Sequence, residues 1–371
     1  MTTWKHAIGS LAGLAATLGV TSAAFAQQPL PIVDAEAARR FAVLPVEVGA
    51  PEGIVVDPER GAVFVGTLNL GGSNFLLRLD LRGRIEAVLD MGTTPLLGLA
   101  LGPRDGQVYF ASAGALVGGS SSIRRVPGDF GPSTTVEDVA ILPLLDPPPG
   151  RSEANADGSM DTITFGRNAP LPNGLVFRED DGSLLFTDSF QAAVFQIADP
   201  SSPSNVCPTG SDCIDLVAQD GLLSAIGVPQ FGVNGIAISP VDASLLVTNT
   251  GDDRLLRIDP ATGAVSVLVE GLNGADGLIR GPGNTVILTA NQSDEVVILD
   301  AATGAPLAEL GEFLGFRRDG TPRGLSVPAS LTLLGNTILV TNLSFGRAPN
   351  ADGSPTPFSI SSIRIPRALR D

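Results

Sequence analysis

A strand-turn-strand unit recurs six times along this chain and constrains its fold more than any other feature. Each unit runs from one residue near the start of an apolar alternating segment, through a turn rich in Pro, Gly or Asp, to a polar residue that ends a second β-branched segment. The two end residues are 15 positions apart in the first five units and 13 apart in the sixth. They are Glu52 and Thr67, Leu97 and Ser112, Asn173 and Asp188, Asn234 and Asn249, Asp276 and Asn291, and Ala329 and Asn342. Hairpins repeated in this way are typical of β-propellers.

The repeat predicts an all-β fold, a six-bladed β-propeller closed by its N- and C-terminal strands. A four-stranded blade takes about 40 to 50 residues, so the wider intervals between units predict insertions near 143–170 and 199–232, with shorter ones at 312–326 and 345–357. Strand-like segments at 41–48 and 359–365 lie outside the six hairpins. If they share a blade, the ring closes and no exposed sheet edge remains. We therefore expect 27–371 to form a single domain.

The first 26 residues have the features of a cleaved signal peptide. Lys5 lies in a polar segment, an apolar stretch follows over 7–20, and Ala24-Phe25-Ala26 precedes Gln27. This order of segments is that of a secretory signal. The apolar stretch is too short to span a bilayer, and no Cys is present at the cleavage point for lipidation. The sequence predicts an exported protein without a membrane anchor, periplasmic or secreted.

Composition excludes several function classes. The only His, Trp and Lys of the chain are His6, Trp4 and Lys5, all within the predicted signal peptide. The remaining chain has no imidazole or amine for a Ser-His-Asp triad, a Schiff base or a phosphate-binding loop. The formal net charge of the full chain is −16, which argues against nucleic acid as a partner because such binding needs a basic surface. Catalysis would have to rely on carboxylate, amide, hydroxyl and arginine groups.

The two cysteines, Cys207 and Cys213, enclose a short polar segment within the 199–232 insertion. In an exported protein a lone pair of this kind is typical of a local disulfide. A redox-active pair is the alternative, and it is disfavoured because the C-x-x-C spacing is missing.

The opening residues of the six units are expected to converge on the propeller axis. Equivalent positions of the innermost strands line the axis, and four of these positions carry side-chain oxygen in an otherwise apolar pattern: Glu52, Asn173, Asn234 and Asp276. Two carboxylates and two amides without nitrogen or sulfur ligands suit Ca²⁺ better than Mg²⁺ or Zn²⁺. The alternative is that these residues only form turns, since Asn-Gly and Asp-Gly are common turn pairs.

At these residues the chain resembles a known family. PEGIVVDP around Glu52, LPNGLVF around Asn173, FGVNGIAISP around Asn234 and GADGLI around Asp276 are similar to motifs of the gluconolactonase, regucalcin (senescence marker protein) and paraoxonase superfamily. The resemblance implies a six-bladed propeller, a calcium ion bound at the four matching positions, and hydrolysis of lactones or related esters. It also implies that Asp276 acts as general base as well as ligand. Gluconolactonases usually carry Asn-Asp-Gly in the second unit, where this chain has Leu97-Gly98.

Two classes of function follow as hypotheses. The first is a calcium-dependent hydrolase of lactones or esters, with Asp276 or Glu52 as the carboxylate base and a small molecule as substrate. An arginine, either Arg151 or Arg167 in the long insertion or Arg323 or Arg347 near the last unit, would hold any anionic substrate group. The second is a non-catalytic, calcium-stabilised propeller that acts as a binding or scaffold module. A strictosidine-synthase-like condensing enzyme is a more distant third.

A second calcium site in the long insertion is disfavoured. The alternating oxygen-bearing residues Glu153, Asn155, Asp157, Ser159 and Asp161 copy part of an EF-hand loop, but Thr164 occupies the place of its bidentate glutamate. A polar surface loop is the preferred reading, because Asn, Asp and Ser favour turns. The same reasoning favours turn roles for Asp188, Asn249 and Asn291.

Overall fold

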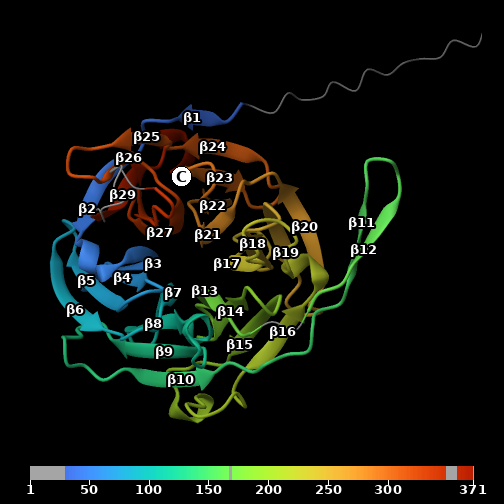
Figure 1. Ribbon diagram of the computed structural model, residues 1–371, viewed down its shortest axis with the longest axis horizontal. Helices are drawn as coiled ribbons and strands as arrows, with labels where there is room; N and C mark the ends of the chain where they lie inside the picture. The colour runs from blue at the N-terminus through green and yellow to red at the C-terminus, as the bar shows by residue number, and fades with distance from the viewer. Residues whose placement is uncertain (1–29, 167–168, 348–356, 371) are drawn as a thin grey trace, which may run out of the picture. The chain divides into compact units, whose positions relative to one another are not determined.

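The computed structural model describes residues 30–166, 169–347 and 357–370. The predicted signal peptide, Arg167 and most of the 345–357 insertion lie outside these residues. Pro31–Asp371 forms one compact unit. Among the described residues the regular structure consists of strands and a few short 3₁₀ turns, and six antiparallel sheets surround a central axis (Figure 1). The predicted six-bladed β-propeller is confirmed.

Each blade is a sheet of four or five strands, which are given below in order from the axis outward. Blade 1 contains β3 (Ala50–Asp57), β4 (Ala62–Leu68), β5 (Phe75–Asp80) and β6 (Ile85–Asp90). Blade 2 contains β7 (Leu96–Leu101), β8 (Gln107–Ser112), β9 (Ser122–Pro127) and β10 (Glu137–Ile141). Blade 3 contains β13 (Pro172–Phe177), β14 (Leu184–Asp188), β15 (Ala193–Ile197) and β16 (Asp215–Gln219).

The remaining three blades follow the same order. Blade 4 contains β17 (Val233–Ile238), β18 (Leu245–Asn249), β19 (Arg254–Ile258) and β20 (Val265–Glu270). Blade 5 contains β21 (Ala275–Arg280), β22 (Thr285–Ala290), β23 (Glu295–Asp300), β24 (Pro306–Leu310) and β1 (Ile32–Asp34). Blade 6 contains β27 (Pro328–Leu334), β28 (Thr337–Asn342), β29 (Phe358–Arg364) and β2 (Arg39–Leu44). The inner two strands of each blade are the hairpin of one sequence unit.

The two ends of the described chain meet in blade 6. Strand β2 pairs antiparallel with β29, with Leu44 opposite Phe358 and Arg39 opposite Ser362. The N-terminal part of the chain thus supplies the outermost strand of the last blade, as the sequence predicted. This strand ends earlier than predicted, because Pro45 leads into a 3₁₀ turn at Val46–Val48. Strand β1 adds parallel to β24 and covers the edge of blade 5, an addition that the sequence analysis missed.

The hydrophobic core lies between blades. Branched and aromatic side chains from the middle strands fill it, and Phe64, Tyr109, Phe110 and Phe186 are fully buried. One cluster joins Phe64 of β4 to Phe110 of β8, and another joins Leu185 of β14 to Val247 of β18. Each blade buries apolar surface only by packing against its neighbours, so the ring gains stability as a closed set.

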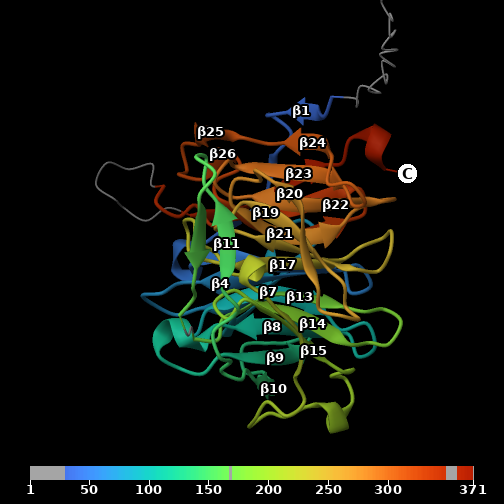
Figure 2. The same ribbon diagram turned by 90° about the vertical axis from the view of Figure 1, so that its right-hand side faces the viewer.

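The predicted insertions form small structures at the margins of the propeller. Within 143–170, β11 (Arg151–Ala154) and β12 (Met160–Ile163) make a separate hairpin, and both views place it outside β20 (Figures 1 and 2). Within 312–326, β25 (Phe313–Phe316) pairs with β26 (Pro322–Gly324). These hairpins carry no ladder to the blade strands.

The predicted disulfide between Cys207 and Cys213 is present, and both residues pack beside a buried cluster of blades 2 and 3. The Cys207 N–H donates to the Val139 carbonyl, and the Ile141 N–H donates to the Gly210 carbonyl. The disulfide loop therefore covers the outer strand β10 with backbone hydrogen bonds, which protects an edge that could otherwise pair with another chain.

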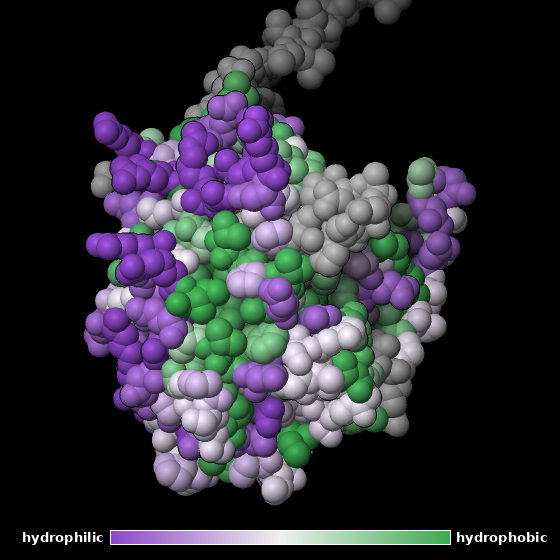
Figure 3. Space-filling view, turned by 60° about the vertical axis from the view of Figure 1, so that its left-hand side comes forward, coloured by the Kyte–Doolittle hydropathy of each residue, from purple (hydrophilic) through white to green (hydrophobic). Residues whose placement is uncertain are grey.

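The surface mixes polar and apolar residues. On the face seen in Figure 3, hydrophilic side chains gather along the upper and left margins, and apolar ones form a patch in the middle of the view. Exposed apolar atoms are ordinary on soluble folds. The described residues contain no helix with the length and apolar character needed to cross a membrane.

Candidate functional site

Every inner strand begins with a β-bulge, and the opening residue of each sequence unit lies in it. In blade 1, Pro51 pairs with Thr67 and the next ladder pair is Ile54 with Val65, so two residues stand opposite one. The same shift occurs in the inner ladder of each of the other five blades. A bulge re-aims side chains relative to the regular strand. Six bulges at one register therefore build a ring of side chains around the axis, formed by Glu52, Leu97, Asn173, Asn234, Asp276 and Ala329.

Close backbone approach between neighbouring blades explains the glycine that follows most ring residues. A Cβ on Gly53 would lie 2.0 Å from the Leu97 carbonyl oxygen, and one on Gly235 would lie 2.4 Å from the Asp276 carbonyl oxygen. No real side chain fits at such distances. The Asn-Gly and Asp-Gly pairs are thus needed for blade packing as well as for turns.

Threonines of the second strands connect the blades at ring level. Thr248 Oγ1 accepts from the Gly235 N–H at 2.8 Å in its own blade and donates to the Asp276 carbonyl of the next blade. Thr187, Thr289 and Thr341 make the same pair of bonds in blades 3, 5 and 6. Blades 1 and 2 have Gly66 and Ala111 at this position. Four of the six ring carbonyls are therefore held by a neighbouring blade's hydroxyl.

Replacing Thr248 with Val is expected to reduce the free energy of unfolding by about 3 kcal/mol, because it strands one buried N–H and one buried C=O. Thr248→Ser keeps the hydroxyl and should cost only about 1 kcal/mol for the lost methyl. Urea unfolding of the two variants and the wild type measures both values. Equal losses in the two variants would mean that the hydroxyl does not connect the blades.

The four polar ring residues are almost completely buried. Glu52, Asn173, Asn234 and Asp276 are 4 to 6% exposed, and Leu97 and Ala329 complete the ring as apolar members. The structure thus brings together all four side chains that the sequence singled out, on blades 1, 3, 4 and 5. No salt bridge to Glu52 or Asp276 occurs among the described residues.

A second layer of hydroxyls fixes the orientation of the two amides. Ser189 Oγ donates its proton to the Val233 carbonyl and therefore accepts from Asn173 Nδ2. Thr250 Oγ1 donates to the Ala275 carbonyl and accepts from Asn234 Nδ2. A hydroxyl has a single proton to donate, so each amide turns its nitrogen toward this layer and donates one N–H to it. The carbonyl oxygens of Asn173 and Asn234 remain as acceptors for the ring.

Asn291 belongs to this second layer, and the turn role favoured for it from sequence does not describe its side chain. Its Nδ2 donates to Asp276 Oδ2 at 3.1 Å. The ladder pairs Ala275 with Ala290, so Ala290 is the structural counterpart of Asp188 and Asn249, and Asn291 corresponds to Ser189 and Thr250. The hairpin of blade 5 is one residue shorter, which a fixed offset of 15 concealed. Asp188 and Asn249 do have turn roles, bonded to nearby backbone groups.

Burial makes the charged forms of both ring carboxylates unfavourable. Desolvation raises the pKa of Glu52 well above its usual value, and the nearby Asp276 charge raises it further. Desolvation raises the pKa of Asp276 to about 7, although hydrogen bonds from Asn291 and Asn234 oppose the shift. Glu52 Oε2 is buried without a hydrogen-bond partner. Two buried carboxylates and an unpartnered oxygen make a site that a cation would stabilise.

The oxygen atoms of the four ring side chains suit a hard cation, and only two of these side chains can carry a negative charge. The described residues include no group of three or more His, Cys, Asp or Glu side chains at metal-binding distances. The ring instead combines two carboxylates with two amide carbonyls, and Ca²⁺ accepts both kinds of oxygen.

Two hollows lie on either side of the ring. An axial channel of about 310 Å³ runs toward the hairpin turns, where Asn173, Asn234, Ile236 and Leu278 line it. A cavity of about 530 Å³ lies at the opposite end, under the long insertion, and includes Ser189, the partner of Asn173. A cavity of this size is in the range of small-molecule sites. We call it the insertion cavity.

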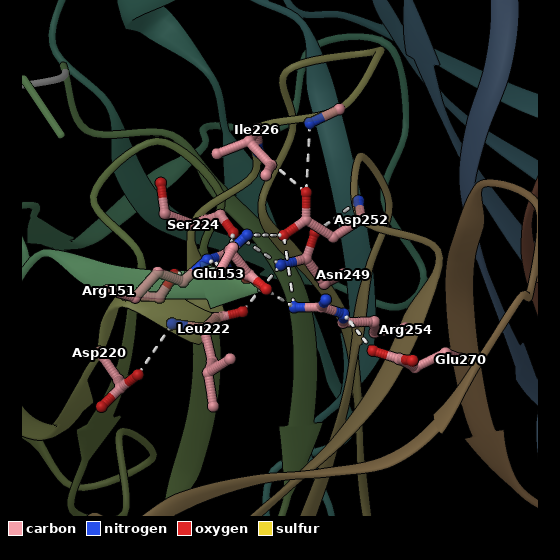
Figure 4. A network of polar contacts seen from close by, with 12 residues as sticks. Arg151, Glu153, Asp220, Leu222, Ser224, Ile226, Asn249, Asp252, Arg254 and Glu270 are labelled. Carbon is pink, nitrogen blue, oxygen red and sulfur yellow. Dashed lines mark hydrogen bonds and ion pairs between the residues drawn. The ribbon is translucent and has the colours of Figure 1, made fainter. Parts of the chain in front are cut away.

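Of the arginines suggested as anion ligands, two form ion pairs, one is exposed away from the ring, and Arg167 lies outside the described residues. Arg151 forms an ion pair with Asp252 and donates to the Gly221 carbonyl, and its side chain is 8% exposed (Figure 4). Arg347 pairs with Asp294, 2.6 Å apart, and lies over the Phe313 ring. Arg323 lies exposed on β26. The structure does not bring any described member of this group to the ring.

The EF-hand-like segment forms the turn between β11 and β12. Asn155 Nδ2 donates to Ser159 Oγ, and Asp157 Oδ1 accepts from the Ser159 N–H at 2.9 Å. Glu153 lies opposite Asp161 in the ladder and forms an ion pair with Arg151. The polar groups of this segment satisfy one another as a surface hairpin.

No family model matches the sequence, and no curated protein is similar enough to match it. Several solved structures resemble its fold. The calcium-binding protein regucalcin from Agrobacterium tumefaciens aligns with a TM-score of 0.57 at 16% identity, over 90% of this chain and 95% of regucalcin. A gluconolactonase from Xanthomonas campestris aligns with a TM-score of 0.52 at 16% identity, over 91% and 97%. Virginiamycin B lyase from Staphylococcus aureus gives 0.51 at 15%, over 89% and 99%. The chain is therefore a β-propeller of the fold shared with these regucalcin and gluconolactonase structures.

Proposed function

We propose that Glu52, Asn173, Asn234 and Asp276 bind one Ca²⁺ ion at the propeller axis. The observation that carries this proposal is the pair of buried carboxylates that have no basic partner in the described part of the chain, one of them with an unsatisfied oxygen. A divalent cation would offset the desolvation that raises the pKa of both carboxyl groups, and the charge of Asp276 that adds to it at Glu52. The committed amide nitrogens of Asn173 and Asn234 leave oxygens for the ion. Mg²⁺ and Zn²⁺ are less suitable, because Mg²⁺ demands strict octahedral geometry and Zn²⁺ prefers His or Cys.

We further propose that the protein is a calcium-dependent hydrolase of lactones or related esters. The bound ion would polarise the substrate carbonyl as a Lewis acid. Asp276 would take the proton of the attacking water as a carboxylate general base. Asn291 holds this carboxylate in place through its bond to Oδ2. Glu52, whose Oε2 has no other partner, is the second candidate base.

The similar structures agree with this proposal, because one is a calcium-binding regucalcin and another is a gluconolactonase. The alternative is a non-catalytic propeller stabilised by calcium that serves as a binding or scaffold module. The burial of the ring supports this alternative, because an ion held by side chains that are only 4 to 6% exposed can have a purely structural role. Export to the periplasm or the medium is supported by the disulfide.

Hydrolysis of a panel of aldono-, γ- and δ-lactones and aryl esters tests the hydrolase proposal. We expect turnover that is lost on chelation, restored by calcium, and reduced at least 100-fold in Asp276→Ala, as for removal of a general base. Thr248→Ser is the matched control, because it alters a ring-level residue without removing an oxygen from the site. Absence of turnover on every substrate, with calcium still raising the unfolding temperature, would favour the binding module.

A further inference from the structure

The second-layer position beside the ring is polar in one half of the propeller and apolar in the other. In each blade the residue before the ring residue pairs with a residue of the second strand, and the next residue of that strand occupies the second-layer position. From blade 1 to blade 6 these positions hold Leu68, Ala113, Ser189, Thr250, Asn291 and Leu343. Hydrogen-bonding side chains thus occupy this position on blades 3, 4 and 5.

The ring residues follow the same division. Asn173, Asn234 and Asp276 lie on blades 3, 4 and 5, whose inner strands β13, β17 and β21 contact one another in that order. Glu52 lies apart from them on blade 1, between blades 2 and 6, whose ring residues are apolar. The second-layer residues of blades 6, 1 and 2 pack in two apolar clusters. Three polar ring residues therefore have a hydrogen-bonding partner in the second layer, whereas the corresponding position in the blade of Glu52 is apolar.

The two ring amides need such a partner to present an oxygen to a cation. A side-chain amide has a donor end and an acceptor end of nearly the same size, so a rotation of half a turn exchanges them. Ser189 accepts from Asn173 Nδ2 at 3.1 Å, and Thr250 accepts from Asn234 Nδ2 at 2.9 Å. Each hydroxyl donates its own proton to a backbone carbonyl of the next blade. It therefore has no proton left for a reversed amide, and the second layer selects one orientation.

The two ring carboxylates do not need to be oriented in this way, because both of their oxygens are acceptors. Asn291 Nδ2 donates to Asp276 Oδ2 at 3.1 Å, which holds that carboxylate in position. Glu52 Oε2 is buried without a hydrogen-bond partner. An apolar second-layer residue is tolerated in blade 1, since either orientation of the Glu52 carboxylate presents an oxygen.

We propose, on the basis of the calcium site proposed above, that Ser189, Thr250 and Asn291 are positioning residues that orient three of the four ring ligands before the cation binds. Glu52 is the fourth ligand, which the fold leaves without such a partner. Groups that orient metal ligands from outside the coordination sphere typically contribute about 10- to 100-fold to metal affinity, because a ligand already held in its binding orientation loses less freedom. This role requires the calcium site but not the hydrolysis of any substrate.

Two threonines of blade 4 provide a matched pair of variants. Both donate to a backbone carbonyl of β21, but Thr250 accepts from the Asn234 side chain, whereas Thr248 accepts from the Gly235 N–H. Calorimetric titration of the folded variants with Ca²⁺ should show a Kd raised about 10- to 100-fold in Thr250→Val. Thr250→Ser keeps the hydroxyl and should bind as the wild type does. Thr248→Val loses the same number of hydrogen bonds and should leave the Kd at the wild-type value.

A double-mutant cycle separates orientation of the amide from a general loosening of the site. Thr250→Val should have no further effect on the Kd in the Asn234→Ala background, because the amide that Thr250 orients is already absent. In the Glu52→Gln background it should keep its full effect, since the two residues act on separate ligands. Where binding is too weak for calorimetry, the rise in unfolding temperature at millimolar calcium gives the same comparison.

The other blades repeat the test and do not depend on the folding of a single variant. Ser189→Ala and Asn291→Leu should each raise the Kd for calcium about 10- to 100-fold, as Thr250→Val does. Leu68→Ala changes the equivalent position of blade 1, and it should leave the Kd unchanged because a leucine side chain donates no hydrogen bond to Glu52.

Calcium binding by the wild type, with an unchanged Kd in Thr250→Val and Ser189→Ala, would overturn the positioning role and leave the calcium site standing. A Kd raised equally in Thr248→Val or Leu68→Ala would also overturn it, because loss of packing alone would then account for the change. If the wild type binds no calcium, both the site and the positioning role are wrong.

Discussion

Calcium is expected to stabilise the wild-type protein strongly at pH 8 and weakly at pH 5. In the absence of metal, the raised pKa values of Glu52 and Asp276 mean that the folded protein binds protons which the unfolded chain releases. This contribution to stability is complete below about pH 4 and is lost as the pH rises through about 7. For Asp276 alone, the shift from 3.8 to about 7 corresponds to a loss of at most about 4 kcal/mol. Calcium replaces the protons, so its effect grows with pH.

The variant Asp276→Asn tests whether the Asp276 carboxylate is the source of this calcium-dependent stability. The neutral amide keeps the shape but needs no proton, so in chelator at pH 8 the variant should be more stable than the wild type. In calcium at about 1,000 times its Kd the wild type gains about 4.1 kcal/mol, so the advantage of the variant should disappear. Urea unfolding with calcium and with chelator, at pH 5 and pH 8, measures these differences.

Asp319→Asn is the control, because the pKa of the Asp319 carboxyl is lowered in the folded protein, whereas that of Asp276 is raised. Its hydrogen bonds from Thr321 lower the pKa of Asp319 to about 2, and it lies on the β25–β26 hairpin. The variant should retain the full calcium response. An unchanged calcium response in Asp276→Asn, or wild-type stability that increases with pH in chelator, would contradict a cation site at the axis.

Arg151→Met is expected to destabilise the protein by about 3 to 5 kcal/mol, the usual cost of removing one partner from a buried ion pair. Arg151 connects β11 to blade 4 by its ion pair with Asp252, whose side chain is 4% exposed, and by bonds to the Gly221 and Ser224 carbonyls (Figure 4). Arg254 is 3.8 Å from the same Asp252 carboxylate and only partly compensates.

A double-mutant cycle with Asp252→Asn measures the coupling. The double variant should be less destabilised than the sum of the two single variants by about 2 kcal/mol, because no buried charge remains unpaired. The exposed pair of Arg84 with Asp80 serves as a comparison, and Arg84→Met should cost less than about 1 kcal/mol. Additive losses at Arg151 and Asp252, or a loss at Arg151 no larger than that at Arg84, would show that the network does not hold the insertion.

Much of the fold could be predicted because each blade is encoded locally. Alternation of apolar residues and the Gly- and Asp-rich turns specify the hairpins, and the number of hairpins specifies the number of blades. The closing strand was also predictable, since β2 and β29 were the terminal segments left without a hairpin partner. Strand β1 was missed because three residues joining an existing edge in parallel leave no periodic pattern in the sequence.

The candidate site was likewise predicted in part from the sequence and missed in part. The register of the repeat identified Glu52, Asn173, Asn234 and Asp276, and the structure brings them together at one level. Ser189, Thr250 and Asn291 were missed as their partners. A signal existed in the position one residue beyond the strand-end residue, but the shorter hairpin of blade 5 hid the equivalence. Arg151 was misjudged because its partner Asp252 lies about a hundred residues away in the chain.

The sequence by itself determined the hairpin repeat, the residue types at the axis and the pairing of the two cysteines, since these depend on spacing between near neighbours along the chain. Only the tertiary structure decided which carboxylates are buried without a basic partner among the described residues, and which amide oxygens remain for a cation. Burial, hydrogen-bond commitment and charge neutralisation depend on groups brought together from different blades. No local pattern specifies them.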